Sequence, residues 1–214
     1  MREPELDRAI PACGIRILTP DAGAVDDTDL ARARQYALLS VLLRHAPNSD
    51  LLAALATLRG DASPLGRAHV GLAQAAYATN VEQIEREYFN LFIGIGRGEL
   101  VPYASYYLTG FLNERPLARL RDDLARLGIE RGEGQTEPED HAAVLCELMA
   151  GLAERRFDGT GEADRELFGK HVSPWIGHFF ADLEQAQAAD FYRRVGTVGR
   201  LFIAIEREAF ALAS

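Results

Sequence analysis

Apolar residues recur at the spacing of an α-helix along almost the whole 214-residue chain, and this periodicity constrains the fold more than any other feature. No stretch shows the sustained alternation of apolar and polar residues that a half-buried strand requires. The sequence therefore predicts an all-α fold, a bundle of about 8–10 helices. The expected helices cover residues 28–44, 50–59, 64–78, 81–92, 116–128, 138–157, 164–168, 174–187 and 189–212.

Local patterns predict where several of these helices begin and what they pack against. Ser63 followed by Pro64 has the form of an N-cap with proline at the first helical position. Asn80 and Gln83 have the spacing of a capping box. Apolar residues in the last helix recur in alternating steps of four and three, which predicts a seam packed along a bundle. The seam comprises Phe191, Val195, Val198, Phe202, Ile205, Ala209 and Leu212.

The stretch 129–136 (IERGEGQT) is the most linker-like part of the chain. We therefore expect a single domain of two packed lobes. The N-terminal lobe would cover about 26–128 and the C-terminal lobe about 138–212, with a hinge near 129–137.

The formal net charge of −9 argues against nucleic acid and against an anionic membrane surface as partners, and favours a basic partner. The N-terminus does not resemble a secretory signal, and no window is apolar enough to span a bilayer, so we expect a cytoplasmic, soluble protein. Cys13 and Cys146 are far apart and show no zinc spacing, which predicts a thiol near the N-terminus and a small buried residue on a helix.

Between residues 93 and 110 the helical periodicity gives way to a segment rich in glycine and tyrosine, which we expect to be a structured loop. Gly94, Gly96 and Gly98 fit a loop that needs positive φ more closely than a phosphate-binding loop, because the Gly-Lys-Ser/Thr of a P-loop is absent. Tyr103, Tyr106 and Tyr107 fit either a peptide-binding surface or a plug between the lobes.

The segment 137–141 (EPEDH) is the most informative part of the sequence. Pro138 fits the first turn of a helix, so Glu137 and Asp140 would lie at the helix N-terminus, where the helix dipole stabilises carboxylates. The same position disfavours an imidazolium, so we expect His141 to be neutral at the edge of an apolar stripe. A structural and a binding role remain open for this histidine.

Motifs for catalysis or metal binding are missing. Glu137, Asp140 and His141 offer plausible metal-ligand types, but no second motif on another helix completes a di-metal site. There is also no nucleophile elbow. We therefore expect no enzyme, no metal and no cofactor. Trp175, the only tryptophan, shares a helical face with Phe179 and Leu183, which favours core packing.

Taken together, the segments 87–92 (EYFNLF), 94–107 (GIGRGELVPYASYY), 137–141 and 171–175 (HVSPW) resemble the TorD/DmsD family of cytoplasmic chaperones for molybdenum-cofactor oxidoreductases. The resemblance implies a single all-helical domain that binds the twin-arginine signal peptide, or the apo form, of such an enzyme and delays export until the cofactor is inserted. It places a binding surface at Pro102, Tyr103, Ser105, Tyr106, Glu137, Pro138, Asp140 and His141.

A twin-arginine leader presents two guanidinium groups followed by an apolar segment, so its receptor needs carboxylates beside an apolar groove. We expect Asp140 and Glu137 to meet the arginines, and Tyr103, Tyr106 and Leu91 to contact the apolar segment. The alternative is a maturation factor that recognises the folded catalytic subunit or its cofactor independently of the leader. Neither the client enzyme nor the choice between monomer and homodimer follows from the sequence.

Overall fold

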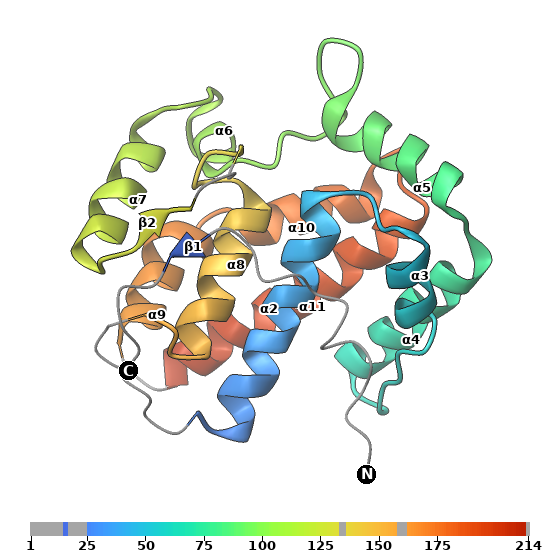
Figure 1. Ribbon diagram of the computed structural model, residues 1–214, viewed down its shortest axis with the longest axis horizontal. Helices are drawn as coiled ribbons and strands as arrows, with labels where there is room; N and C mark the ends of the chain where they lie inside the picture. The colour runs from blue at the N-terminus through green and yellow to red at the C-terminus, as the bar shows by residue number, and fades with distance from the viewer. Residues whose placement is uncertain (1–14, 17–24, 133–135, 158–161, 213–214) are drawn as a thin grey trace. The chain divides into compact units, whose positions relative to one another are not determined.

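The computed structural model describes residues 15–16, 25–132, 136–157 and 162–212. In this part of the chain the strands are β1 (Ile15–Arg16) and β2 (Glu130–Arg131), which pair antiparallel. The other regular elements there are helices, so the all-α prediction is confirmed (Figure 1). They are α2 (Asp27–Arg44), α3 (Ser49–Leu55), α4 (Pro64–Ala78), α5 (Val81–Tyr88), the π-helix η1 (Phe89–Ile93), α6 (Ala104–Thr109), α7 (Arg115–Arg126), α8 (Ala142–Ala153), α9 (Ala163–Leu167), the π-helix η2 (Phe168–Val172), α10 (Ile176–Gln185) and α11 (Phe191–Leu212).

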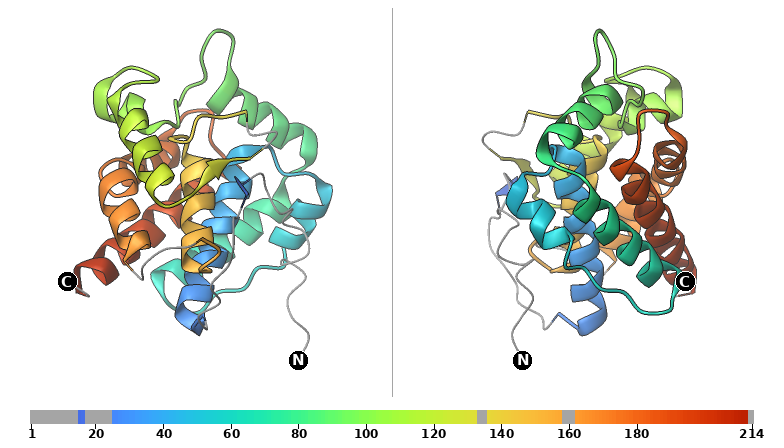
Figure 2. Two further views of the ribbon diagram at one scale, coloured as in Figure 1. Left: turned by 60° about the vertical axis from the view of Figure 1, so that its left-hand side comes forward. Right: turned by 90° about the vertical axis from the view of Figure 1, so that its right-hand side faces the viewer.

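The chain forms two compact units, and the first comprises residues 45–101 and 177–212 of the described chain. In this unit α4 packs along α11, while α3 packs against α4 and α5 against α11 (Figure 2). Glu87 of α5 accepts hydrogen bonds from the backbone N–H groups of Asp190, Phe191 and Tyr192 at 2.8, 3.2 and 2.7 Å. Burial raises the pKa of Glu87, and these three donors oppose the rise. The carboxylate thus satisfies donors at the start of α11 that the helix itself leaves free.

The second unit comprises residues 15–16, 25–44, 102–132, 136–157 and 162–176. Helix α8 lies at its centre, because every residue from 142 to 153 is buried. It packs along α2, as Figure 1 shows. Glu147, buried in α8, forms an ion pair with Arg44 of α2. The candidate segments 102–106 and 137–141 belong to this same unit.

The two units have different bounds from the two lobes predicted from the sequence. Each unit is assembled from segments far apart in the chain, so the boundaries lie near residues 44, 101 and 176. Glu130 and Arg131, in the predicted hinge, pair with Ile15 and Arg16 inside the second unit. Residues 133–135 of that hinge lie outside the described residues.

The predicted N-caps that depend on local sequence are present. The Ser63 side chain accepts a hydrogen bond from the N–H of Gly66 at 2.9 Å, and Asn80 accepts one from Gln83 at 3.0 Å. Gly94 ends η1 with a φ of 63°, as expected of a glycine that leaves a helix. A Cβ at Gly94 would lie 2.1 Å from the carbonyl oxygen of Arg97, so no larger residue fits this turn.

Two predictions about where helices lie are wrong, and so is part of a prediction about which residues of the last helix are buried. The expected loop of residues 93–110 contains helix α6, and the helix expected from Pro138 begins at Ala142, because the chain makes a turn at Pro138. The predicted seam of α11 is buried only as far as Phe202, since Ile205 is 47% and Leu212 is 87% exposed. The core assignments of Trp175 and Cys146 are confirmed, each being 1% exposed, and burial raises the pKa of the Cys146 thiol to about 12. Cys13 and the predicted break at 159–161 lie outside the described residues.

Helices α10 and α11 approach closely at Gly196. A Cβ there would lie 2.7 Å from the backbone nitrogen of Glu184 and 2.9 Å from the carbonyl oxygen of Phe180. We therefore expect Gly196→Ala to lower the free energy of unfolding by about 1 kcal/mol in urea titrations, because the clash outweighs the gain in helix propensity. The matched control is Gly71→Ala in α4, where the nearest atom is 3.9 Å away and a small stabilisation is expected. Equal effects of the two substitutions would contradict this account.

Candidate functional site

The structure places two of the candidate segments side by side in the second unit. Tyr103 and His141 form an antiparallel β-bridge. On either side of it, the N–H of Ala104 donates to the carbonyl of Asp140 at 3.0 Å, and that of Ala142 donates to the carbonyl of Pro102 at 2.8 Å. The backbone thus joins residues 36 to 40 positions apart in the chain.

Asp140 is at the centre of this arrangement and is only 1% exposed. Its Oδ2 atom accepts hydrogen bonds from the backbone N–H of Ser105, at 2.9 Å, and from the Ser105 hydroxyl group. Asp140 therefore caps the first turn of α6 from a distant part of the chain. Its other oxygen, Oδ1, is buried and has no hydrogen-bond partner among the described residues. A buried acceptor without a partner is uncommon and calls for an explanation.

His141 is the N-cap of α8, where its Nδ1 accepts a hydrogen bond from the N–H of Ala143 at 3.1 Å. The ring is 5% exposed and packs edge-on against Tyr103, with ring centroids 4.9 Å apart. Burial lowers the pKa of His141 to about 4; nearby Glu137 opposes this, and Arg44 adds to it. The imidazole is thus neutral at pH 7, as the sequence predicted, and its proton is on Nε2. His141 immediately precedes α8, whereas the sequence predicted that it lies within the helix.

The remaining candidates differ in how accessible they are. The hydroxyl of Tyr103 donates to the Glu137 carboxylate at 2.5 Å, and both side chains are half-buried. Tyr106 and Pro138 are also half-buried. Leu91, in contrast, is 0% exposed and belongs to the first unit. Its predicted contact with a partner is untested and gains no support from this burial.

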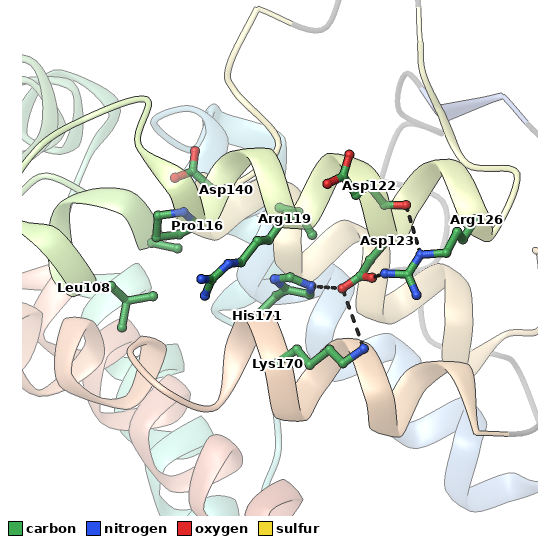
Figure 3. Close-up of a pocket in the computed structure, with 11 residues that line it drawn as sticks. Leu108, Pro116, Arg119, Asp122, Asp123, Arg126, Asp140, Lys170 and His171 are labelled. Atoms are coloured by element: carbon green, nitrogen blue, oxygen red, sulfur yellow. Dashed lines mark hydrogen bonds and ion pairs between the residues drawn. The ribbon is translucent and has the colours of Figure 1, made fainter.

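Asp140 also lines a pocket of about 420 Å³ within the second unit (Figure 3). In Figure 3, Asp140 and Pro116 lie at one end of the pocket, Asp123 and Arg126 lie towards the other end, and Arg119 extends between them. None of the α7 residues in this wall was among the candidates predicted from the sequence. The lining comprises Ala104, Leu108, Pro116, Arg119, Leu120, Asp122, Asp123, Arg126, Asp140, Lys170 and His171.

Charges at one end of the pocket are paired with each other. Asp123 forms ion pairs with Arg126 and with Lys170, and its Oδ2 lies 2.5 Å from Nε2 of His171. The buried Oδ1 of Asp140, in contrast, has no hydrogen-bond partner among the described residues. The carboxylate of Asp123 is thus held by neighbouring cations, whereas that of Asp140 is held by Ser105 through Oδ2.

The described residues offer less support for a metal site, for a membrane-spanning helix or for a phosphate-binding loop. They contain no group of three or more histidine, cysteine, aspartate or glutamate side chains arranged to hold a metal ion. None of the helices in the described part of the chain is long and apolar enough to cross a membrane. Gly94 and Gly96 of the glycine-rich loop have positive φ, as predicted. The loop is closed at its base by hydrogen bonds from Glu99 N to Asn90 O (3.0 Å) and from Leu100 N to Leu91 O (2.8 Å).

Comparison with known proteins links this chain to proteins of redox enzyme assembly. The family model described as "Nitrate reductase delta subunit" matches residues 58–181. The Vibrio cholerae protein named "Chaperone protein TorD" is 25% identical over 130 residues, 56% of this chain and 59% of that protein. The Haemophilus influenzae protein named "Probable Tat proofreading chaperone DmsD" is 33% identical over 114 residues, 52% of this chain and 54% of that protein. The chain thus matches little more than half the length of these relatives.

A solved structure supports the fold. The crystal structure of a candidate redox enzyme maturation protein from Archaeoglobus fulgidus superposes with a TM-score of 0.57 at 21% sequence identity. The superposition covers 81% of this chain and 93% of the other.

Proposed function

Because the chain belongs to the nitrate reductase delta subunit family, we propose that it is a molecular chaperone for the maturation of a molybdenum-cofactor oxidoreductase. In this proposal it acts in the cytoplasm and binds the twin-arginine signal peptide, the apo catalytic subunit, or both. Binding delays export until the cofactor is inserted. The protein catalyses no reaction itself.

One observation carries the signal-peptide part of the proposal: the buried carboxylate of Asp140, whose Oδ1 has no partner, lies in the wall of a pocket. A guanidinium group that reached Oδ1 would complete its hydrogen bonding and neutralise its charge. The acidic net charge of −9 adds long-range attraction for a basic peptide.

The neighbouring groups fit the same role. Glu137 is half-buried and accepts from the Tyr103 hydroxyl, which orients its carboxylate for a second cation. Tyr103 and Tyr106 are half-buried aromatic side chains that can contact apolar groups, while the Tyr103 hydroxyl stays hydrogen-bonded to Glu137. Ser105 and His141 act through the backbone and through Asp140, because both are buried.

Calorimetric titration with synthetic twin-arginine leaders from the host's molybdoenzymes tests the proposal. We expect saturable binding to one leader, and about tenfold weaker binding by Asp140→Asn, which keeps an oxygen acceptor for Ser105 but loses the charge. Asparagine is a better test than alanine, because alanine would also remove the cap of α6. Asp50→Asn, at the first turn of α3, is the control and should bind like the unchanged protein.

Two outcomes would count against the proposal. Equal affinities of Asp140→Asn and the unchanged protein would remove Asp140 from the binding surface. Full affinity for a client that lacks its leader, without binding to any leader peptide, would favour recognition of the folded catalytic subunit.

A further inference from the structure

Three exposed apolar side chains follow one another at the end of α6. Leu108 is 44%, Phe111 is 70% and Leu112 is 49% exposed, and we call these three residues the apolar ridge. Large apolar side chains that gather on a surface mark contact sites more often than isolated ones do. The ridge lies wholly in the second unit, as does the pocket beside Asp140.

Hydrogen bonds hold the ridge in its exposed position. Gly110 ends α6 in the left-handed conformation, with a φ of 83°, and its N–H donates to the carbonyl of Tyr106 at 2.8 Å. The Thr109 hydroxyl donates to the carbonyl of Ser105 at 2.7 Å and accepts from the N–H of Phe111 at 3.2 Å. A turn fixed in this way presents Phe111 to solvent with little backbone entropy left to lose on binding.

The ridge is continuous with the pocket, because Leu108 belongs to both. Asp140, with its unpartnered Oδ1, and Pro116 lie in the same wall (Figure 3). Leu108 therefore links the wall that contains Asp140 to the apolar ridge. A buried carboxylate is thus followed by an exposed apolar surface. A twin-arginine leader has the complementary order, with its guanidinium groups followed by an apolar segment.

The charges of the pocket limit how many cations it can take. Its lining has three carboxylates, Asp122, Asp123 and Asp140, against Arg119, Arg126 and Lys170. Asp123 is engaged by two of these cations and by His171, and Oδ2 of Asp140 is occupied by Ser105. Oδ1 of Asp140 is buried without a hydrogen-bond partner, and Oδ1 of Asp123, which also lacks one, is instead paired with the charged Arg126.

We propose that this pocket takes one cationic side chain of the client's leader at Asp140 Oδ1 and that the adjacent apolar residues of the leader lie on the apolar ridge. The inference rests on the proposed function and specifies where on the protein the leader binds. Arg119 then lowers the affinity for the leader, because its guanidinium lies in the same pocket and repels the bound cation. It thereby also disfavours a second cation there.

A double-mutant cycle between the protein and the leader peptide tests the ridge. Phe111→Ser should weaken binding of the full leader about tenfold. It should leave unchanged the affinity for a leader whose apolar segment is replaced by serine, because that peptide has nothing to place on the ridge. The control is Ile95→Ser, which changes a 98% exposed apolar side chain in the first unit and should not affect either affinity.

Arg119→Gln tests the sign of the charge that the pocket binds. If a cation binds, this variant should bind the leader about two to five times more tightly at low ionic strength, and the gain should shrink in high salt. Weaker binding by Arg119→Gln would mean that the pocket takes an anion, and it would overturn the inference.

The outcomes separate this inference from the proposed function. Leader binding that is sensitive to Asp140→Asn but insensitive to Phe111→Ser would leave the chaperone proposal standing and reject the ridge. Absence of leader binding by the unchanged protein would reject both.

Discussion

Replacing Glu87 with alanine is expected to lower the free energy of unfolding by about 2–3 kcal/mol, because three N–H donors at the start of α11 would lose a charged acceptor. Phe191 and Tyr192, which contribute two of these donors, have side chains that are 2% and 0% exposed. Water can therefore replace the carboxylate only in part. Thermal unfolding should show a decrease in Tm of roughly 5 °C or more.

Two further variants separate the lost cap from a general effect of substitution in α5. Glu87→Gln keeps one carbonyl oxygen as an acceptor and should lose less stability than the alanine variant. Glu85→Ala removes an exposed carboxylate from the same helix and should change the free energy of unfolding by under about 0.5 kcal/mol. A decrease in stability as large for Glu85→Ala as for Glu87→Ala would show that the cap of α11 contributes little.

Glu87 also illustrates what sequence patterns can predict in this fold and what they cannot. Caps made by a neighbouring residue, such as Ser63 and Asn80, were predicted because donor and acceptor lie three residues apart. Glu87 caps α11 from more than 100 residues away, and Asp140 caps α6 from 35 residues away. No local spacing encodes these pairings, so they become visible only when the chain has folded.

The same limit applies to the helix at residues 104–109. Gly98, Pro102 and a cluster of tyrosines suppress the apolar periodicity, and the helix is only six residues long. It is held at its start by Asp140 and ends at Gly110. Since that support is tertiary, a periodicity argument predicts a loop.

The candidate site was predicted in part. The β-bridge between Tyr103 and His141 brings together two motifs that were predicted to form one surface. His141 is neutral, as predicted, but the main cause of its lowered pKa is burial, whereas the prediction rested on the start of a helix. The pocket wall on α7 was missed, because Arg119 and Pro116 have no distinctive pattern in an ordinary amphipathic helix. The bounds of the two compact units differ from those of the two predicted lobes, because each unit is assembled from segments far apart in the chain, and a linker-like stretch indicates only contiguous lobes.

Because of His141, the free energy of unfolding should begin to decrease at a pH well above the pH range in which most carboxylates titrate. Its pKa of about 4 in the folded protein lies below the usual value of 6.5, which applies to the unfolded chain. The unfolded chain therefore binds the proton first as the pH falls, and stability decreases from about pH 6.5 until the pH reaches the folded pKa near 4. At pH 5 this corresponds to about 2 kcal/mol of lost stability.

Urea unfolding at pH 7 and at pH 5 measures this effect, with His141→Asn as the informative variant. Asparagine is a favoured N-cap and can still accept from Ala143, but it does not titrate. The variant should therefore lose about 2 kcal/mol less than the unchanged protein between the two pH values, even if it is somewhat less stable at pH 7. His45→Asn, at an exposed position, should keep the original pH dependence. If His141→Asn kept it too, then the pKa of His141 would be the same in the folded protein and in the unfolded chain, and burial would not lower it.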